Sequence, residues 1–154
     1  MFKNVLVGVD RHTGGRDALA LAEQLVATGG QLTLAHVYPG DSRLRRDAAL
    51  DYRQMEQERA LELLTEARDA GGVDAELRYV ESSSPGRGLH ELAEAINADL
   101  LVVGSSRRGC IGRLLLGDDS RGTLSGSPCP VAIAPADYSQ TAYDSECLDM
   151  TLTS

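Results

Sequence analysis

Residues Leu100–Gly117 read LLVVGSSRRGCIGRLLLG, and this stretch contains the strongest signal for the fold. Its apolar run Leu100–Val103 stops at Gly104, which is typical of a short strand buried on both faces. A glycine- and arginine-rich loop follows, and a second apolar run, Leu114–Leu116, then ends at Gly117. Open α/β sheets bind ligands in the loops at the carboxyl ends of their strands. The stretch therefore predicts a central strand followed by a glycine-lined ligand loop.

Short apolar runs and helical segments alternate along the rest of the chain. Apolar residues at i, i+3, i+4 and i+7 mark three helices with one buried stripe each, at 18–25, 60–67 and 89–96. The runs with the length of strands are Val5–Val9, Leu32–Val37, Leu77–Val80, Leu100–Val103 and Val131–Ala134. Such alternation requires a mostly parallel sheet with helices on both faces. The expected fold class is therefore α/β with a doubly wound sheet.

Glycines and prolines indicate where these elements begin and end. The glycine pairs Gly29–Gly30 and Gly71–Gly72 are expected to end the first and second helices as C-caps. Ser84–Pro85 supplies an N-cap residue and then proline for the third helix. A short fourth helix is expected from Asp118 to Gly126. Pro128–Pro130 precedes the last strand and places it at a sheet edge, where proline is tolerated.

Composition narrows the class of protein. The chain has 154 residues and a formal net charge of −8, which fit a single domain and disfavour nucleic acid and anionic membranes as partners. Cys110, Cys129 and Cys147 form no CxxC pair, so reduced thiols in a cytoplasmic protein are expected. No apolar run approaches the length of a membrane span, and the first residues are expected to form a strand and not a signal peptide.

Motifs for catalysis are incomplete. Gly104 and Gly109 have P-loop spacing, but the lysine and Ser/Thr that must follow are absent. His12–Gly14 resembles the first half of the HxGH motif of nucleotidyl transferases, with Gly15 in place of the second histidine. No two histidines have a metal-ligand spacing, so no metal site and no catalytic residue are expected. His36 is expected to be packed and hydrogen-bonded.

Asp10 is the acidic residue with the clearest candidate role. It ends the first predicted strand and would face the loop of the fourth strand across the switch point of the sheet. Its carboxylate would either accept hydrogen bonds from a base or ribose, or cap the first helix. The residues alone leave both roles open.

Several segments together resemble the universal stress protein family from Met1 to about Ala136. These segments are NVLVGVD, LTLAHV, ADLLVVGSSRRG, RLLLG and SPCPVAIAP. The resemblance implies an adenine-nucleotide alpha hydrolase-like fold, with a five-stranded parallel sheet in the order 3-2-1-4-5. It also implies homodimers through the last strand, made by Val131, Ala132, Ile133 and Ala134. We therefore expect one domain at 1–136 and a loosely held polar tail at 137–154.

The resemblance also indicates a nucleotide site with two departures from the family pattern. ATP-binding members carry G-x-x-G, nine residues and then G-[S/T]; here Gly104 and Gly117 match, whereas Arg107 replaces glycine and Asp118 replaces Ser/Thr. The candidate nucleotide-binding residues are Asp10, Val37, Gly104, Ser105, Arg107, Gly109, Gly117 and Asp118.

Both departures disfavour a triphosphate. A side chain at Arg107 obstructs the close approach of backbone to phosphate. A carboxylate at Asp118 takes the N–H donors of a helix start and repels an anion. Two unit charges about 4 Å apart at an effective dielectric near 20 interact by about 4 kcal/mol, enough to remove micromolar affinity. Either arginine of the Arg107–Arg108 pair would offset this cost by binding phosphate, but pairing with Asp118 is favoured.

These observations lead to a first expectation and an alternative. The first is a non-enzymatic cytoplasmic regulator of the universal stress type, a homodimer that acts through an unknown protein partner, with nucleotide binding weak or lost. The alternative is a stress protein that binds ATP or AMP with Mg²⁺ and hydrolyses ATP slowly at most. An adenylate-transferring enzyme rests only on the broken motif at His12 and ranks third.

Overall fold

The computed structural model describes residues 1–11, 15–105, 123 and 125–140. The described elements follow in the order β1 (Phe2–Gly8), α1 (Arg16–Leu25), β2 (Val26–Tyr38), α2 (Arg46–Gly71), β3 (Glu76–Glu81), α3 (Pro85–Ala95), β4 (Leu100–Gly104) and β5 (Val131–Ala134). The fourth helix expected from Asp118 to Gly126 falls mostly outside these residues.

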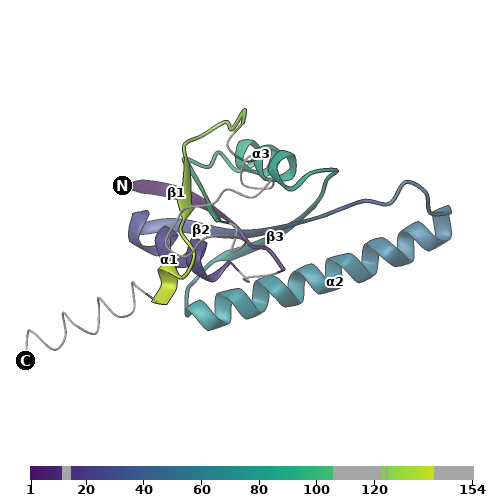
Figure 1. The fold of residues 1–154 in the computed structure, drawn as a ribbon, viewed down its shortest axis with the longest axis horizontal. Helices are drawn as coiled ribbons and strands as arrows, with labels where there is room; N and C mark the ends of the chain where they lie inside the picture. The colour runs from purple at the N-terminus through teal and green to yellow at the C-terminus, as the bar shows by residue number, and fades with distance from the viewer. Residues whose placement is uncertain (12–14, 106–122, 124, 141–154) are drawn as a thin grey trace, which may run out of the picture.

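The strands form one parallel sheet in the order β3-β2-β1-β4-β5. This order confirms the doubly wound sheet and its expected topology. The chain turns from one side of β1 to the other after β3, so the switch point lies between β1 and β4. The last strand is at the edge of the sheet, as the prolines before it predict (Figure 1).

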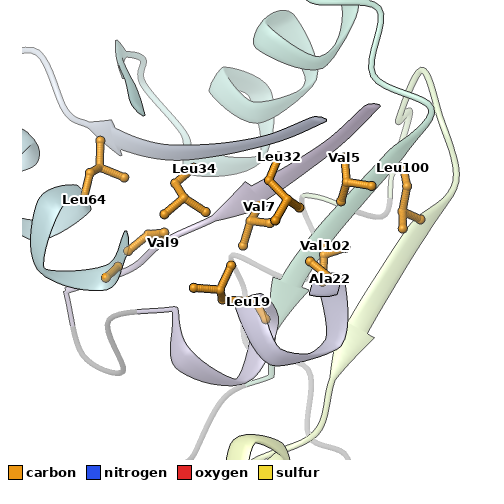
Figure 2. Packing of buried hydrophobic residues seen from close by; sticks show 12 residues of the cluster. Val5, Val7, Val9, Leu19, Ala22, Leu32, Leu34, Leu64, Leu100 and Val102 are labelled. Carbon is orange, nitrogen blue, oxygen red and sulfur yellow. The ribbon is translucent and has the colours of Figure 1, made fainter. Parts of the chain in front are cut away.

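Helices cover both faces of the sheet, and each face has its own core. Alternate residues along β1 supply the two cores. Val5 and Val7, with Val9 just after the strand, pack with α1 and α2, whereas Leu6 packs with α3. Figure 2 shows residues of the first core, to which α1 contributes Leu19. Because β1, β2 and β4 are buried on both faces, their sequences read as continuous apolar runs.

Two of the three predicted helix boundaries are confirmed. Gly72 is the left-handed C-cap of α2 (φ 63°), and the hydroxyl of Ser84 accepts a hydrogen bond of 3.2 Å from the N–H of Arg87 at the start of α3. The expectation that Gly29–Gly30 ends the first helix is wrong. That helix ends at Leu25 and continues directly into β2, where Gly29 (φ 78°) lies in an irregularity of the β1–β2 pairing.

The chain after β5 is attached to the first turn of α1. Asp17, only 4 % exposed, accepts hydrogen bonds from the N–H groups of Asp137 (3.1 Å) and Ser139 (2.9 Å), and from the Ser139 hydroxyl (2.8 Å). The hydroxyl of Tyr138 also donates to Gln24, with an oxygen–oxygen distance of 2.7 Å. The segment that was expected to be a loosely held tail thus begins with docked residues.

Candidate functional site

Strand register brings together three of the residues predicted for the nucleotide site. Gly8 pairs with Ala35 and Val7 pairs with Val102. Continuing these two offsets beyond the strand ends puts Asp10 level with Val37 on one side and with Ser105 on the other. The N–H of Val9 donates to the carbonyl oxygen of Ala35, which continues the β1–β2 ladder, and the N–H of Ser105 donates to that of Ala134, which continues the β4–β5 ladder. The register therefore places Asp10, Val37 and Ser105 next to one another at the carboxyl edge of the sheet, at its switch point.

The same face of the sheet presents these positions. Val37 and Val103 belong to the core under α3, and the alternation of strand side chains assigns Ser105 to that face too. Helix α3 lies very close here: a Cβ atom added to Gly88 would come within 2.8 Å of a methyl group of Val37. This contact allows no side chain at Gly88, so the glycine brings the start of α3 against the site.

Ser105 is the described residue that most directly indicates a ligand. It is 8 % exposed, and its Oγ atom is buried without a hydrogen-bond partner in the part of the chain that the structure describes. A buried hydroxyl without a partner costs free energy, which a ligand with a polar group would recover. Beside it, a Cβ atom added to Gly104 would meet no described atom within 4 Å. Among the described residues, nothing fills the space at the end of β4 next to this unsatisfied hydroxyl.

His36 fixes the end of β1 in front of Asp10. Its ring is 7 % exposed, and Nδ1 lies 2.7 Å from the carbonyl oxygen of Val9. This confirms that His36 is packed and hydrogen-bonded. His90 on α3 is part-buried, with Nε2 2.5 Å from the carbonyl oxygen of Thr123.

An ion-pair cluster next to the site was not predicted. Glu56 on α2 is 3 % exposed and binds the guanidinium groups of Arg11 and Arg59. Arg11 directly follows Asp10, so this cation beside the site is committed to a buried carboxylate. The position of Glu56 one turn before Ala60 on the buried stripe of α2 is the signal that could have indicated its burial, although not its partner.

The remaining predicted residues divide into two groups. Arg107, Gly109, Gly117 and Asp118 lie outside the described residues, as do His12–Gly14. Val131, Ala132 and Ile133 on β5 are half-buried at the sheet edge, and Ala134 is buried. The dimer contact expected of this strand stays a prediction.

No metal centre or membrane span is present in the described parts of the chain. Their His, Cys, Asp and Glu side chains form no group of three that could hold a metal ion. None of their helices is long and apolar enough to cross a membrane. Burial raises the pKa of the Cys129 thiol; the Ser127 side chain lowers it by a smaller amount, and the charge of Asp99 adds to the rise.

The arrangement defines a class: a doubly wound α/β protein whose candidate ligand site lies at the switch point of a parallel sheet. The Universal stress protein family matches residues 1–135. The chain belongs to the universal stress protein family. It is 30% identical over 135 residues to a universal stress protein of Thermus aquaticus, covering 86% of this chain and 98% of that protein.

Three further proteins are similar to this chain. A universal stress protein of Mycobacterium tuberculosis is 31% identical over 144 residues, and the match covers 87% of this chain but only 49% of that relative. Among solved structures, a universal stress protein in complex with cAMP is 29% identical, with a TM-score of 0.61 and coverage of 86% of this chain and 97% of that one. A universal stress protein from Archaeoglobus fulgidus in complex with dAMP has the same fold, with a TM-score of 0.56, 18% identity and coverage of 85% and 96%.

Proposed function

We propose that this chain is a non-enzymatic regulator of the universal stress type, a cytoplasmic homodimer that acts through a protein partner and in which ATP binding is weak or lost. The observation that supports this most directly is the pairing of Arg11 with buried Glu56. The cation that follows Asp10 is thereby neutralised within the protein. Separating it from Glu56 to bind phosphate would break a buried ion pair and leave Glu56 with Arg59, at 3.5 Å, as its remaining cationic partner.

The residue types of the phosphate loop support the same proposal. Arg107 stands where ATP-binding members have glycine, and Asp118 stands where they have Ser or Thr. A triphosphate carries several negative charges, so a carboxylate at a helix start would repel it more strongly than it would repel a monoester or diester.

A second candidate function is the binding of a smaller adenine nucleotide, such as AMP or cAMP. It is favoured by the unsatisfied Oγ atom of Ser105, level with Asp10 and Val37 at the carboxyl edge. In that complex, Asp10 and Ser105 would hydrogen-bond the nucleoside, and the phosphate would extend toward the loop that follows β4. The solved complex of a 29% identical family member with cAMP is consistent with this candidate.

Hydrolysis of ATP is not part of the proposed function. It would require a positioned water, a base and a metal or basic group to stabilise charge. Asp10 is the one well-placed carboxylate, and no second acidic motif follows it to hold Mg²⁺. Turnover, if measured, should be well below the roughly 1–100 per second that is typical of kinases.

Nucleotide content and affinity test both candidates. Purified protein is denatured and its supernatant analysed by absorbance and mass spectrometry; calorimetric titrations with AMP, cAMP and ATP in Mg²⁺ follow. We expect no bound ATP, and an affinity for ATP no higher than that for AMP.

Ser105→Ala should weaken the binding of AMP or cAMP by about three- to tenfold, the value of one hydrogen bond, whereas the exposed Ser42→Ala should leave it unchanged. Tight ATP binding would overturn the first proposal; no binding of any nucleotide would remove the second.

A further inference from the structure

Exposed apolar side chains are concentrated on one helix. Of the five large hydrophobic residues that are exposed in the described chain, three lie on α2: Leu50, Met55 and Leu61. The side of α2 that faces the sheet is made by other residues, with Ala60 and Leu64 at its centre. The apolar residues named first therefore face solvent, and burying them in a partner would be favourable.

The first half of α2 is not buried against the sheet. No residue from 46 to 55 is buried, and this half of the helix extends past the ends of the strands (Figure 1). An isolated helical segment of about ten residues is only marginally stable in water. The projecting part of α2 is therefore available to a partner and would be stabilised by one.

Three carboxylates lie on successive turns of α2 in the same part of the helix as Leu61. Glu58, Glu62 and Glu66 are exposed and form no ion pair with another described residue, whereas the exposed carboxylates of Glu81 and Glu91 are paired with arginines. Like charges at i and i+4 destabilise a helix. The arrangement disfavours the isolated helix and would favour a complex with a basic surface.

These residues also line two open hollows. One, of about 480 Å³, is lined by Glu58, Leu61, Glu62, Thr65 and Glu66. The other, of about 390 Å³, shares two of these glutamates and is also lined by Leu63, Arg11 and Arg59. The first is a shallow surface of one helix, on which Leu61 is the one apolar side chain and is surrounded by three carboxylates. This surface suits an apolar side chain flanked by lysine or arginine.

We propose that the outer face of α2, defined by Leu50, Met55, Leu61, Glu58, Glu62 and Glu66, docks a basic amphipathic segment of a partner protein. Its charge would repel a second copy of this acidic chain, nucleic acid and an anionic membrane. A helix with lysine or arginine at i, i+4 and i+8 matches the three carboxylates, and an apolar residue between them would enter the hollow at Leu61. Both arginines of the second hollow are paired with Glu56, which offsets their repulsion of a basic segment. The docked segment would then lie against Arg11, the residue that follows Asp10.

This proposal rests on the proposed function only in requiring a protein partner. The test uses the full chain, labelled with ¹⁵N, and a synthetic helical peptide of about 14 residues in which lysine and leucine alternate at helical spacing. A second peptide has serine in place of every leucine. Amide shifts should concentrate on α2 and near Arg11, and the serine peptide should bind at least about fivefold more weakly.

Matched variants separate a specific face from general attraction between opposite charges. Glu58→Gln with Glu62→Gln and Glu66→Gln should weaken the peptide about tenfold, and Leu61→Ser should weaken it severalfold. Asp74→Asn with Glu91→Gln and Glu94→Gln removes the same charge elsewhere and should leave the affinity unchanged. Equal losses in both triple variants, equal binding of both peptides, or no binding at millimolar peptide would overturn the proposal. No nucleotide takes part, so a failure here is distinguishable from failure of the nucleotide proposals.

Discussion

The hydroxyl of Ser139 donates a hydrogen bond of 2.8 Å to Asp17, across 122 residues of chain. The Asp17 carboxylate also accepts N–H groups of the same segment, which begins a helical turn at residue 138. A carboxylate at the start of a helical turn satisfies donors that would otherwise have no partner. Asp17 thus acts as a capping residue supplied by a distant part of the chain.

Removal of this carboxylate should destabilise the fold. Asp17→Ala leaves the donors of Asp137 and Ser139 without an acceptor, and we expect a loss of about 1–3 kcal/mol in the free energy of unfolding. Ser139→Ala removes one hydrogen bond and should cost about 0.5–1.5 kcal/mol. Urea unfolding measures both values, with the exposed Asp51→Ala as a control. Losses no larger than that of the control would show that the attachment is not stabilising.

Restoring the family's phosphate motif should increase ATP affinity. In the double variant Arg107→Gly with Asp118→Ser, the loop loses an obstructing side chain and a repelling carboxylate. Calorimetry at constant Mg²⁺ should show tighter ATP binding than in the parent, by a factor of ten or more if about 1.4 kcal/mol of repulsion is removed. Arg68→Gly with Asp69→Ser, in the last turn of α2 and remote from the carboxyl ends of the strands, is the matched control. Unchanged ATP affinity would mean that these two positions do not limit binding.

The edge strand β5 should mediate dimer formation. An apolar edge strand pairs with its own copy across a twofold axis or is otherwise a site of aggregation. Ile133→Lys should therefore produce monomers or insoluble protein, whereas a lysine at exposed Arg78 on the opposite edge should leave the dimer intact. Sedimentation of the parent at micromolar concentration must first show a dimer. A monomeric parent would contradict the prediction, and the attached segment after Ala136 would then be the first candidate for protecting the edge.

Cys129 should be slow to alkylate. Because burial raises the pKa of its thiol, less thiolate is present at a given pH than in the unfolded chain. Iodoacetamide at pH 8 should modify Cys129 severalfold more slowly in native protein than in urea, as measured by mass spectrometry of its peptide. The native state also binds the thiol proton more tightly than the unfolded chain does. The resulting contribution of Cys129 to the free energy of unfolding is therefore fully present below the pKa of the unfolded thiol and is lost as the pH rises through the pKa of the folded thiol. Equal native and unfolded rates would contradict both statements.

Local sequence patterns were sufficient to predict the helices and strands and their arrangement in layers. Apolar runs identified the strands because β1, β2 and β4 are buried on both faces, and the resemblance supplied their order. The glycine pair 29–30 misled because a helix end and a strand irregularity both require positive φ, which glycine allows in either setting. Sequence spacing does not distinguish the two.

Contacts between distant residues explain what the sequence could not predict at the site. Asp10, Val37 and Ser105 were each identified, but only the strand register shows that they are level. The pairing of Arg11 with Glu56 spans 45 residues and joins a loop to a helix. No periodicity encodes such a contact, because periodicity describes one element at a time.

The direct passage from Leu25 of α1 to Val26 of β2 has a consequence for protein engineering. With no loop between helix and strand, an inserted residue would shift the helical stripe against the sheet or move β2 out of register with β1. Insertions, cleavage sites and permuted termini should instead be tolerated at 39–45, where the chain between β2 and α2 is largely exposed. A fluorescent or protease-sensitive reporter for this protein is best introduced there.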